Sequence, residues 1–139
     1  MKVIWCLFLL LGLFSCSKDK VVEESFKAIS YDKRDSAFLD LYTSENKFWG
    51  NYQVFYFDKK KDTGRVDGEI FGDTLKGTYR FISRDNSKML EPIIFKRAGT
   101  GIQLGKGDKY IYFGIPFYKE NTIKYGDSLF QFVRIPKKT

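Results

Sequence analysis

The chain alternates apolar and polar residues with a period of two from Ala37 almost to its end. An alternation of this kind predicts β-strands that have one face buried and the other in water. Glycine, aspartate, asparagine and lysine gather between the alternating stretches and predict turns. The strands that we expect from this pattern cover residues 37–43, 48–57, 65–71, 74–83, 88–97, 101–105, 109–113 and 128–135.

Most connections between these strands are short enough for hairpins, and Gly72-Asp73 is a two-residue hairpin turn. A chain of consecutive hairpins is a meander, which protects its edges best by closing on itself. We therefore expect an all-β fold, a small antiparallel meander barrel of about eight strands with a calycin-like (lipocalin-like) shape. Its interior would be filled by side chains or hold one small ligand. A sandwich or a half-open barrel fits the pattern almost as well.

Glycines recur on the face that the alternation predicts to point inward, at Gly50, Gly68 and Gly77. In small barrels such glycines allow the strands to bend sharply.

The first residues follow another pattern, an uncharged apolar run from Val3 to Phe14 that comes directly after Lys2. The run is too short to span a bilayer, which takes about 20 residues, and it has the form of an export signal. Leu13-Phe14-Ser15-Cys16 resembles the lipobox of bacterial lipoproteins. The resemblance implies that residues 1–15 are removed and that Cys16 becomes a lipidated N-terminus. An uncleaved anchor and a core helix are the alternatives.

Residues 16–36 are rich in charge and are expected to form the lipidated N-terminus and a tether. Within them Val22, Phe26 and Ile29 have helical spacing and predict a short helix. The predicted organisation is therefore a signal peptide (1–15), this tether (16–36) and a β-barrel domain (37–139).

Composition removes several kinds of chemistry. The sequence has no histidine and two cysteines, of which Cys6 would leave with the signal and Cys16 would be acylated. Catalysis by Ser-His or Cys-His pairs, and zinc or copper sites built on imidazole or thiolate, are thereby excluded. We expect no metal site, cofactor or catalytic residue. The export signal argues against nucleic acid as a partner of this basic chain, whose net charge is +7. We interpret the charge as a contribution to solubility, with a mild attraction to lipid headgroups or acidic glycans as the alternative.

Carboxylates are the groups that remain for catalysis. Asp67 and Glu69 lie on one strand face about 6.6 Å apart, a separation that a glycosidase could use. They share that face with Arg65, so we interpret it as solvated. Glu91 shares the inward parity of Phe95. It would either point inward, with Arg80 or Arg97 as its partner, or be turned outward by a bulge at Pro92, which we favour.

Aromatic residues make up 18% of the chain and form three sets. Packing in the core is an alternative for each of them. Aromatics around the long loop 114–127 could surround a ligand at the barrel mouth, with the loop as a lid, and three on the outside of one strand could form a surface patch. The expected core set is Tyr52, Tyr56, Tyr79, Phe81 and Phe95, the mouth set is Tyr110, Tyr112, Phe117, Tyr118 and Tyr125, and the patch is Trp49, Phe55 and Phe57.

The stretch from Gly64 to Ser83, with a Leu-x-Leu strand before it and Phe95-Lys96 after it, resembles a group of small Bacteroidota lipoproteins. Cys16-Ser17-Lys18-Asp19 is also typical of that phylum. The resemblance implies a lipid-anchored protein of the cell envelope, in the outer membrane, on its periplasmic or surface side.

The expected role is a non-catalytic binding module for a small apolar or amphipathic ligand, or for an envelope protein. An accessory lipoprotein with a filled barrel is the alternative, and a carboxylate-based glycan hydrolase is a second one.

Overall fold

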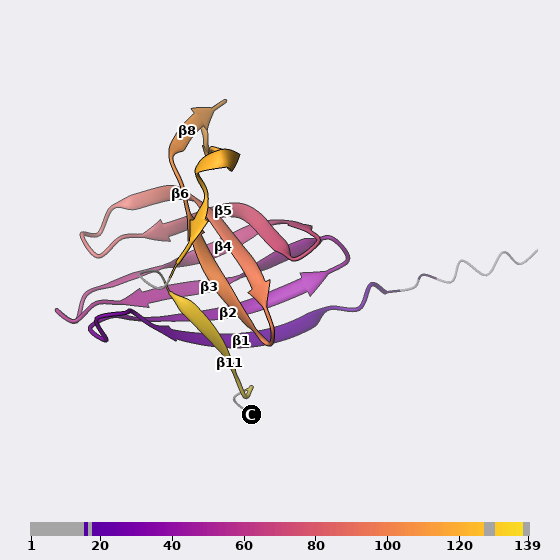
Figure 1. The fold of residues 1–139 in the computed structure, drawn as a ribbon, viewed down its shortest axis with the longest axis horizontal. Coiled ribbons are helices and arrows are strands. Elements are labelled where there is room, and N and C mark those ends of the chain that lie inside the picture. Colours follow the sequence, from indigo (N-terminus) through magenta and orange to yellow (C-terminus); the bar gives the residue numbers. More distant parts are fainter. Residues whose placement is uncertain (1–15, 17, 127–129, 138–139) are drawn as a thin grey trace, which may run out of the picture.

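Eight antiparallel strands close into a barrel in the computed structural model, which describes residues 16, 18–126 and 130–137 (Figure 1). The first strand pairs with both the second and the last, and the seventh pairs with both the sixth and the last, so the strand pairings form a closed ring. The closed meander is thus confirmed against the sandwich and the half-open barrel. The barrel strands are β1 (Val22–Ile29), β2 (Ser36–Ser44), β3 (Lys47–Phe55), β4 (Lys61–Phe71), β5 (Thr74–Ile82), β6 (Lys88–Ala98), β7 (Gly101–Lys106) and β11 (Gln131–Ile135).

One barrel strand differs from the predicted set. β1 lies inside residues 16–36, where we expected a tether with a short helix, and this expectation is wrong. Phe26 and Ala28 are buried in the barrel while Lys27 and Ile29 are exposed, which is a period of two. The spacing of Val22, Phe26 and Ile29 fits a helix equally well, and the hydrogen bonds offered by β2 and β11 decide for the strand.

The strand expected at 109–113 lies outside the barrel. It forms β8 (Lys109–Tyr112), which pairs only with β9 (Ile115–Tyr118) as a separate two-stranded hairpin. A 3-10 turn, η1 (Glu120–Thr122), and the short β10 (Lys124–Tyr125) then lead back to the end of β7. We call the segment from β8 to β10, residues 109–125, the excursion, and in Figure 1 it rises from the barrel wall.

The barrel interior is filled. Aromatic rings meet in its centre, where Tyr52 lies edge-on to Phe95 at 6.1 Å and Phe95 edge-on to Phe132 at 5.9 Å between ring centroids. Of the expected core set, Tyr52, Tyr79 and Phe95 are buried, and the other two are partly buried against them. The buried cluster is Phe26, Ala28, Ala37, Leu39, Leu41, Phe48, Tyr52, Val54, Val66, Leu75, Tyr79, Ile93, Phe95, Ile102 and Phe132, and Tyr56 and Phe81 pack against it.

Glycines allow neighbouring strands of the barrel to pack closely in two places, between β4 and β5 and between β2 and β3. Gly68 and Gly77 are directly opposite in the β4–β5 ladder, and a Cβ on either would overlap the backbone of the other strand. Gly50 is buried, and its Cβ would overlap the Asp40 carbonyl on β2. A side chain at any of these three positions would therefore clash with the neighbouring strand, while the sharp bend that we expected at them stays a prediction.

The two ends of the barrel differ. At the end where β1 begins, Glu24 accepts hydrogen bonds from the Arg97 guanidinium of β6, the shorter of 3.0 Å, and lies 3.9 Å from Arg134 of β11. The Glu24 side chain is only 10% exposed, so this ion pair closes that end. The opposite end is open, and the excursion leaves the barrel there.

Candidate functional site

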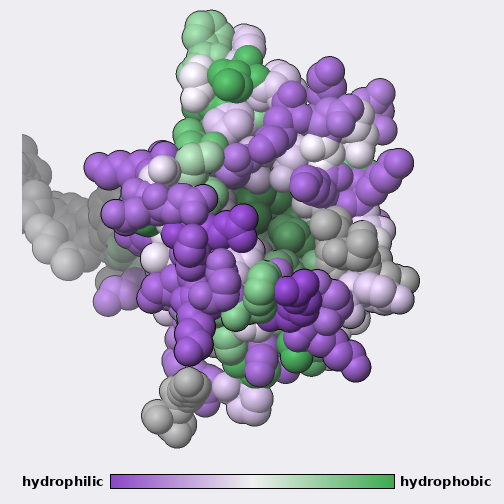
Figure 2. Space-filling model, turned by 90° about the vertical axis from the view of Figure 1, so that its left-hand side faces the viewer, coloured by the Kyte–Doolittle hydropathy of each residue, from purple (hydrophilic) through white to green (hydrophobic). Residues whose placement is uncertain are grey.

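The open end of the barrel is a depression of about 470 Å³, which we call the mouth. Figure 2 looks onto this end and shows a hollow with hydrophobic residues at its bottom and hydrophilic residues around it. Tyr52, Val54 and Tyr79 line its floor, and Asp62 and Lys106 are among its charged residues. The filled core lies directly below, so the mouth is shallow and does not lead to an internal ligand cavity.

Hydrogen bonds hold the tyrosines of the mouth. The Tyr56 hydroxyl donates to Asp62 at 2.6 Å, and the other oxygen of Asp62 accepts the Arg84 amide at 2.6 Å. The Tyr79 hydroxyl donates to the Tyr52 carbonyl at 3.0 Å. Burial raises the pKa of Tyr52, Tyr56 and Tyr79, and the bond to Asp62 raises the pKa of Tyr56 further. These phenols therefore stay neutral at physiological pH.

Glu91 points toward the mouth, and the bulge that we favoured is absent. The β5–β6 register is unbroken through Tyr79↔Glu91, and Glu91 accepts a hydrogen bond from Lys109 at 2.5 Å rather than from Arg80 or Arg97. Pro92 fits a regular strand because β7 pairs with β6 only over Phe95–Ala98. Beyond that pairing the β7 side of β6 has no strand partner in the described part of the chain, so the backbone N–H that proline lacks does not remove a hydrogen bond from the sheet.

Tyr118 fills the place where β6 and β7 separate. It lines the mouth on one side and, on the other, a second depression on the outside of the barrel. Burial raises the pKa of its hydroxyl. Pro92 and Ile93 also border both depressions, so the two are neighbours across the barrel wall.

The second depression has a volume of about 610 Å³ and is here called the outer groove. One side is the outer wall formed by β4, β5 and β6, and the other is the excursion from β8 to residue 123. The Tyr110 and Phe117 rings stack at 5.7 Å with an interplanar angle of 27° and form the far wall. An ion pair between Lys76 of β5 and Glu120 of η1 fastens the excursion to the barrel.

The outer groove combines apolar walls with charged groups, as small-molecule sites commonly do, and its volume lies within the usual range for them. Ile94 of β6, which is 3% exposed although it points away from the barrel interior, is buried beneath the excursion. The groove residues are Gly68, Glu69, Phe71, Lys76, Gly77, Thr78, Pro92, Ile93, Ile94, Tyr110, Phe117, Tyr118, Lys119, Glu120 and Ile123.

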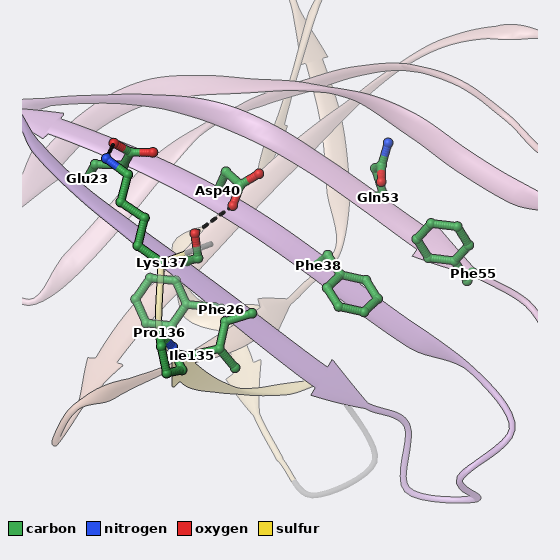
Figure 3. Close-up of a pocket in the computed structure, with 10 residues that line it drawn as sticks. Glu23, Phe26, Phe38, Asp40, Gln53, Phe55, Ile135, Pro136 and Lys137 are labelled. Atoms are coloured by element: carbon green, nitrogen blue, oxygen red, sulfur yellow. Dashed lines mark hydrogen bonds and ion pairs between the residues drawn. The ribbon is translucent and has the colours of Figure 1, made fainter. Parts of the chain in front are cut away.

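A third depression, of about 440 Å³, runs over the outer face of β1, β2 and β3 (Figure 3). Its apolar part is the edge-to-face pair Phe38–Phe55, with 5.7 Å between centroids. Its polar part holds the ion pair Glu23–Lys137 and Asp40, which accepts a hydrogen bond from Ser25. Much of this surface is polar, and it provides fewer apolar contacts than the outer groove.

The aromatics expected at the mouth are divided by the structure. Only Tyr118 reaches the mouth, while Tyr110 and Phe117 belong to the outer groove. Tyr112 lies at the hairpin tip, and Tyr125 is on β10 against Gly105. The loop 114–127 contains β9, η1 and β10 and covers the outer wall rather than acting as a lid over the mouth. Its residue 127 lies outside the described residues.

The expected surface patch is not a single surface. Trp49 stacks on Tyr42 at 6.1 Å, and Phe55 packs against Phe38 in the third depression. Phe57 comes after β3 ends and lies under the Arg34 guanidinium at 3.8 Å. Three further residues of the outer groove were not predicted from the sequence, namely Phe71, Pro92 and Ile94. The available signal was that Pro92 and Ile94, two apolar residues, share the outward face of β6.

The polar residues singled out from sequence lie at the surface. Asp67 and Glu69 are exposed on the outer face of β4, as predicted. Cys16 is exposed ahead of β1. Within residues 16, 18–126 and 130–137, no three or more His, Cys, Asp or Glu side chains gather as a metal site would require. Over the same residues the structure contains no helix of the length and apolarity needed to cross a bilayer.

Comparison with known proteins gives no relative: no family model, curated protein or solved structure matches this chain. The outer groove therefore has to be interpreted from its own geometry.

Proposed function

We propose that this chain is a lipid-anchored protein of the cell envelope that binds a small apolar or amphipathic ligand in the outer groove. The observation that carries the proposal is the apolar groove between the barrel wall and the stacked pair Tyr110–Phe117. A filled interior moves the expected ligand from inside the barrel to its outer surface. Lys119 borders the groove and would face an anionic group on the ligand.

The lipobox-like Leu13-Phe14-Ser15-Cys16 supports the anchoring part of the proposal. Its test is the intact mass of the protein purified from its own membrane. We expect a chain that begins at Cys16 and carries acyl groups, and we expect Cys16→Ser to lack them. An unacylated wild-type chain of full length would refute the anchoring. Native mass spectrometry of the same sample would also report a ligand that the protein retains.

The ligand part can be tested with a fluorescent fatty acid as the probe. Phe117 and Phe55 are matched in exposure, at 39% and 36%, but only Phe117 lines the outer groove. Phe117→Ala is expected to weaken probe binding about 10-fold or more, because the bound probe would cover the ring and a phenylalanine that becomes fully buried contributes about 1.5–3 kcal/mol. Phe55→Ala is expected to leave it unchanged. Equal binding by both variants and wild type would refute the groove as the site.

A second candidate function is an accessory lipoprotein without a small ligand, which the filled interior favours. In that case the groove would hold a segment of another envelope protein. The fatty acid would then not bind, and chemical cross-linking in intact cells from a photoreactive residue at position 117 would capture a single protein partner.

A further inference from the structure

The tip of the β8–β9 hairpin exposes large hydrophobic side chains that the fold does not use. Phe113 is 86% exposed and Ile111 is 75% exposed, and both lie beyond the barrel wall. Phe113 and Gly114 form the turn, both with positive φ, at 47° and 76°. A phenylalanine is unfavourable in that conformation, and asparagine or glycine would be the ordinary choice. The fold alone therefore does not account for an apolar ring at this position.

The exposed residues form one continuous patch. Tyr112 lies edge-on to Phe113 at 4.5 Å, and Ile115 follows on the returning strand at 44% exposure. From Tyr110 to Tyr118 no residue carries a charge. Figures 1 and 2 both show the hairpin projecting at the top of the molecule, and in Figure 2 hydrophobic residues are visible there. An apolar projection of this kind marks a surface that contacts something apolar.

Charged residues at the base of the hairpin identify the partner. Lys106 and Lys109 come just before the uncharged stretch, and Lys119 and Lys124 come after it. Two of the nearby acids are already paired, Glu120 of η1 with Lys76 of the barrel and Glu91 with Lys109. The remaining acid is Asp108, so Lys106, Lys119 and Lys124 leave this collar with a net positive charge. The hairpin therefore presents apolar side chains first, then tyrosines, then cations. Anionic bilayers present hydrocarbon, an interface that favours tyrosine, and negative headgroups in the same order.

We propose that the hairpin tip, Ile111–Ile115, inserts into the interface of an anionic lipid bilayer. The ladder from Lys109↔Tyr118 to Tyr112↔Ile115 pairs backbone groups of the two strands with each other, and the remaining ones stay at the hydrated interface. The inference goes beyond the proposed function, because it holds whether or not Cys16 is acylated. With an acyl anchor it adds a second attachment, which fixes the orientation of the barrel on the membrane.

Insertion would also orient the barrel. Tyr110 and Phe117 lie on the same hairpin behind the tip, so the outer groove would open next to the headgroups. A lipid-derived or amphipathic ligand could then reach the groove directly from the membrane surface.

The test uses the chain from Ser17 onward, which lacks the leader and all thiols but contains every residue of the core, from Phe26 to Phe132. An environment-sensitive fluorophore is attached at Phe113→Cys. The matched control is Tyr31→Cys, a position that is 78% exposed in the β1–β2 connection. With vesicles of phosphatidylcholine and phosphatidylglycerol we expect the label at 113 to shift to the blue and to be quenched by brominated lipid. The label at 31 should stay in water.

Binding is then measured by co-sedimentation. The double variant Ile111→Asp, Phe113→Asp should bind these vesicles at least about 10-fold more weakly, and added salt or pure phosphatidylcholine should weaken wild-type binding. Because the tip lies outside the core, the variant should keep the wild-type circular dichroism and melting temperature. It should also keep its affinity for the groove probe, which separates this result from the proposed function.

Two outcomes would overturn the proposal. One is a label at 113 that stays aqueous in the presence of vesicles. The other is sedimentation equilibrium that shows a dimer lost in the double variant, because the tip would then contact a second copy of the chain.

Discussion

The buried tyrosines make high pH the sharpest perturbation of this fold. Tyr52 is 3% exposed and Tyr79 is 5% exposed, and burial raises the pKa of both well above the value of about 10 for an unfolded chain. Above pH 10 the unfolded chain therefore releases protons that the folded chain retains. The unfolded state then binds fewer protons, so the free energy of unfolding falls as the pH rises. Below pH 10 the two states are equally protonated at these groups, and their contribution is complete.

The size of the effect follows from proton linkage. Each such tyrosine lowers the free energy of unfolding by about 1.4 kcal/mol per pH unit above pH 10. Tyr52 and Tyr79 together give about 3 kcal/mol per unit, or about 6 kcal/mol at pH 12. A domain of this size is commonly stable by about 5–15 kcal/mol. We therefore expect the protein to lose a large part of its stability, or to unfold, near pH 12.

Urea denaturation followed by circular dichroism, from about pH 8 to about pH 12, measures this slope, and the absorbance of phenolate reports ionisation in parallel. Two variants separate the contributions. Tyr79→Phe should cost about 1 kcal/mol at neutral pH, because it leaves the Tyr52 carbonyl without its hydrogen bond. Tyr52→Phe should cost less, because none of the hydrogen bonds among the described residues uses its hydroxyl.

Each of these variants should also reduce the alkaline slope by about half. Phenolate formation at these residues near pH 10 with the fold intact, or a full slope in both variants, would refute the reasoning.

Three further predictions concern the barrel itself. Gly77→Ala should lower the free energy of unfolding by about 1–3 kcal/mol in thermal unfolding, because its Cβ would overlap the β4 backbone. The control Gly126→Ala, where the space is open, should be neutral or slightly stabilising. Equal effects of the two substitutions would contradict the close approach of β4 and β5. Glu24→Gln should cost about 1–2 kcal/mol, and a double-mutant cycle with Arg97→Gln should show coupling, while strict additivity would exclude the ion pair. Phe95→Ala should cost about 3–5 kcal/mol in urea denaturation, and a loss below about 1 kcal/mol would mean a loosely packed interior.

Most barrel strands could be predicted from the sequence because their signal is local. In β3 and β5 each second residue is apolar, so the alternation shows the strand and the face that it buries. Gly68 and Gly77 were recognisable in the same way, since they continue the inward parity. The number of barrel strands, eight, was also predicted correctly, although one of the eight was assigned to residues 109–113 instead of to β1.

The outer groove could not be predicted in this way. Ile94 lies on the outward parity of β6, and Phe117 lies on a hairpin that has its own sheet. They meet only because the excursion folds back over the barrel wall, and no local pattern records this. Glu91 is similar, because its partner Lys109 belongs to another segment.

The sequence by itself therefore determined the strands, their buried faces and the turns between them, because these depend on neighbours along the chain. The tertiary structure decided which segments close the barrel. β1 lies in a charged segment and β8 in an aromatic one, but β1 finds β2 on one edge and β11 on the other, whereas β8 finds only β9 among the described residues. Closure depends on backbone hydrogen bonds between distant segments, and those bonds exist only after the rest of the sheet has formed.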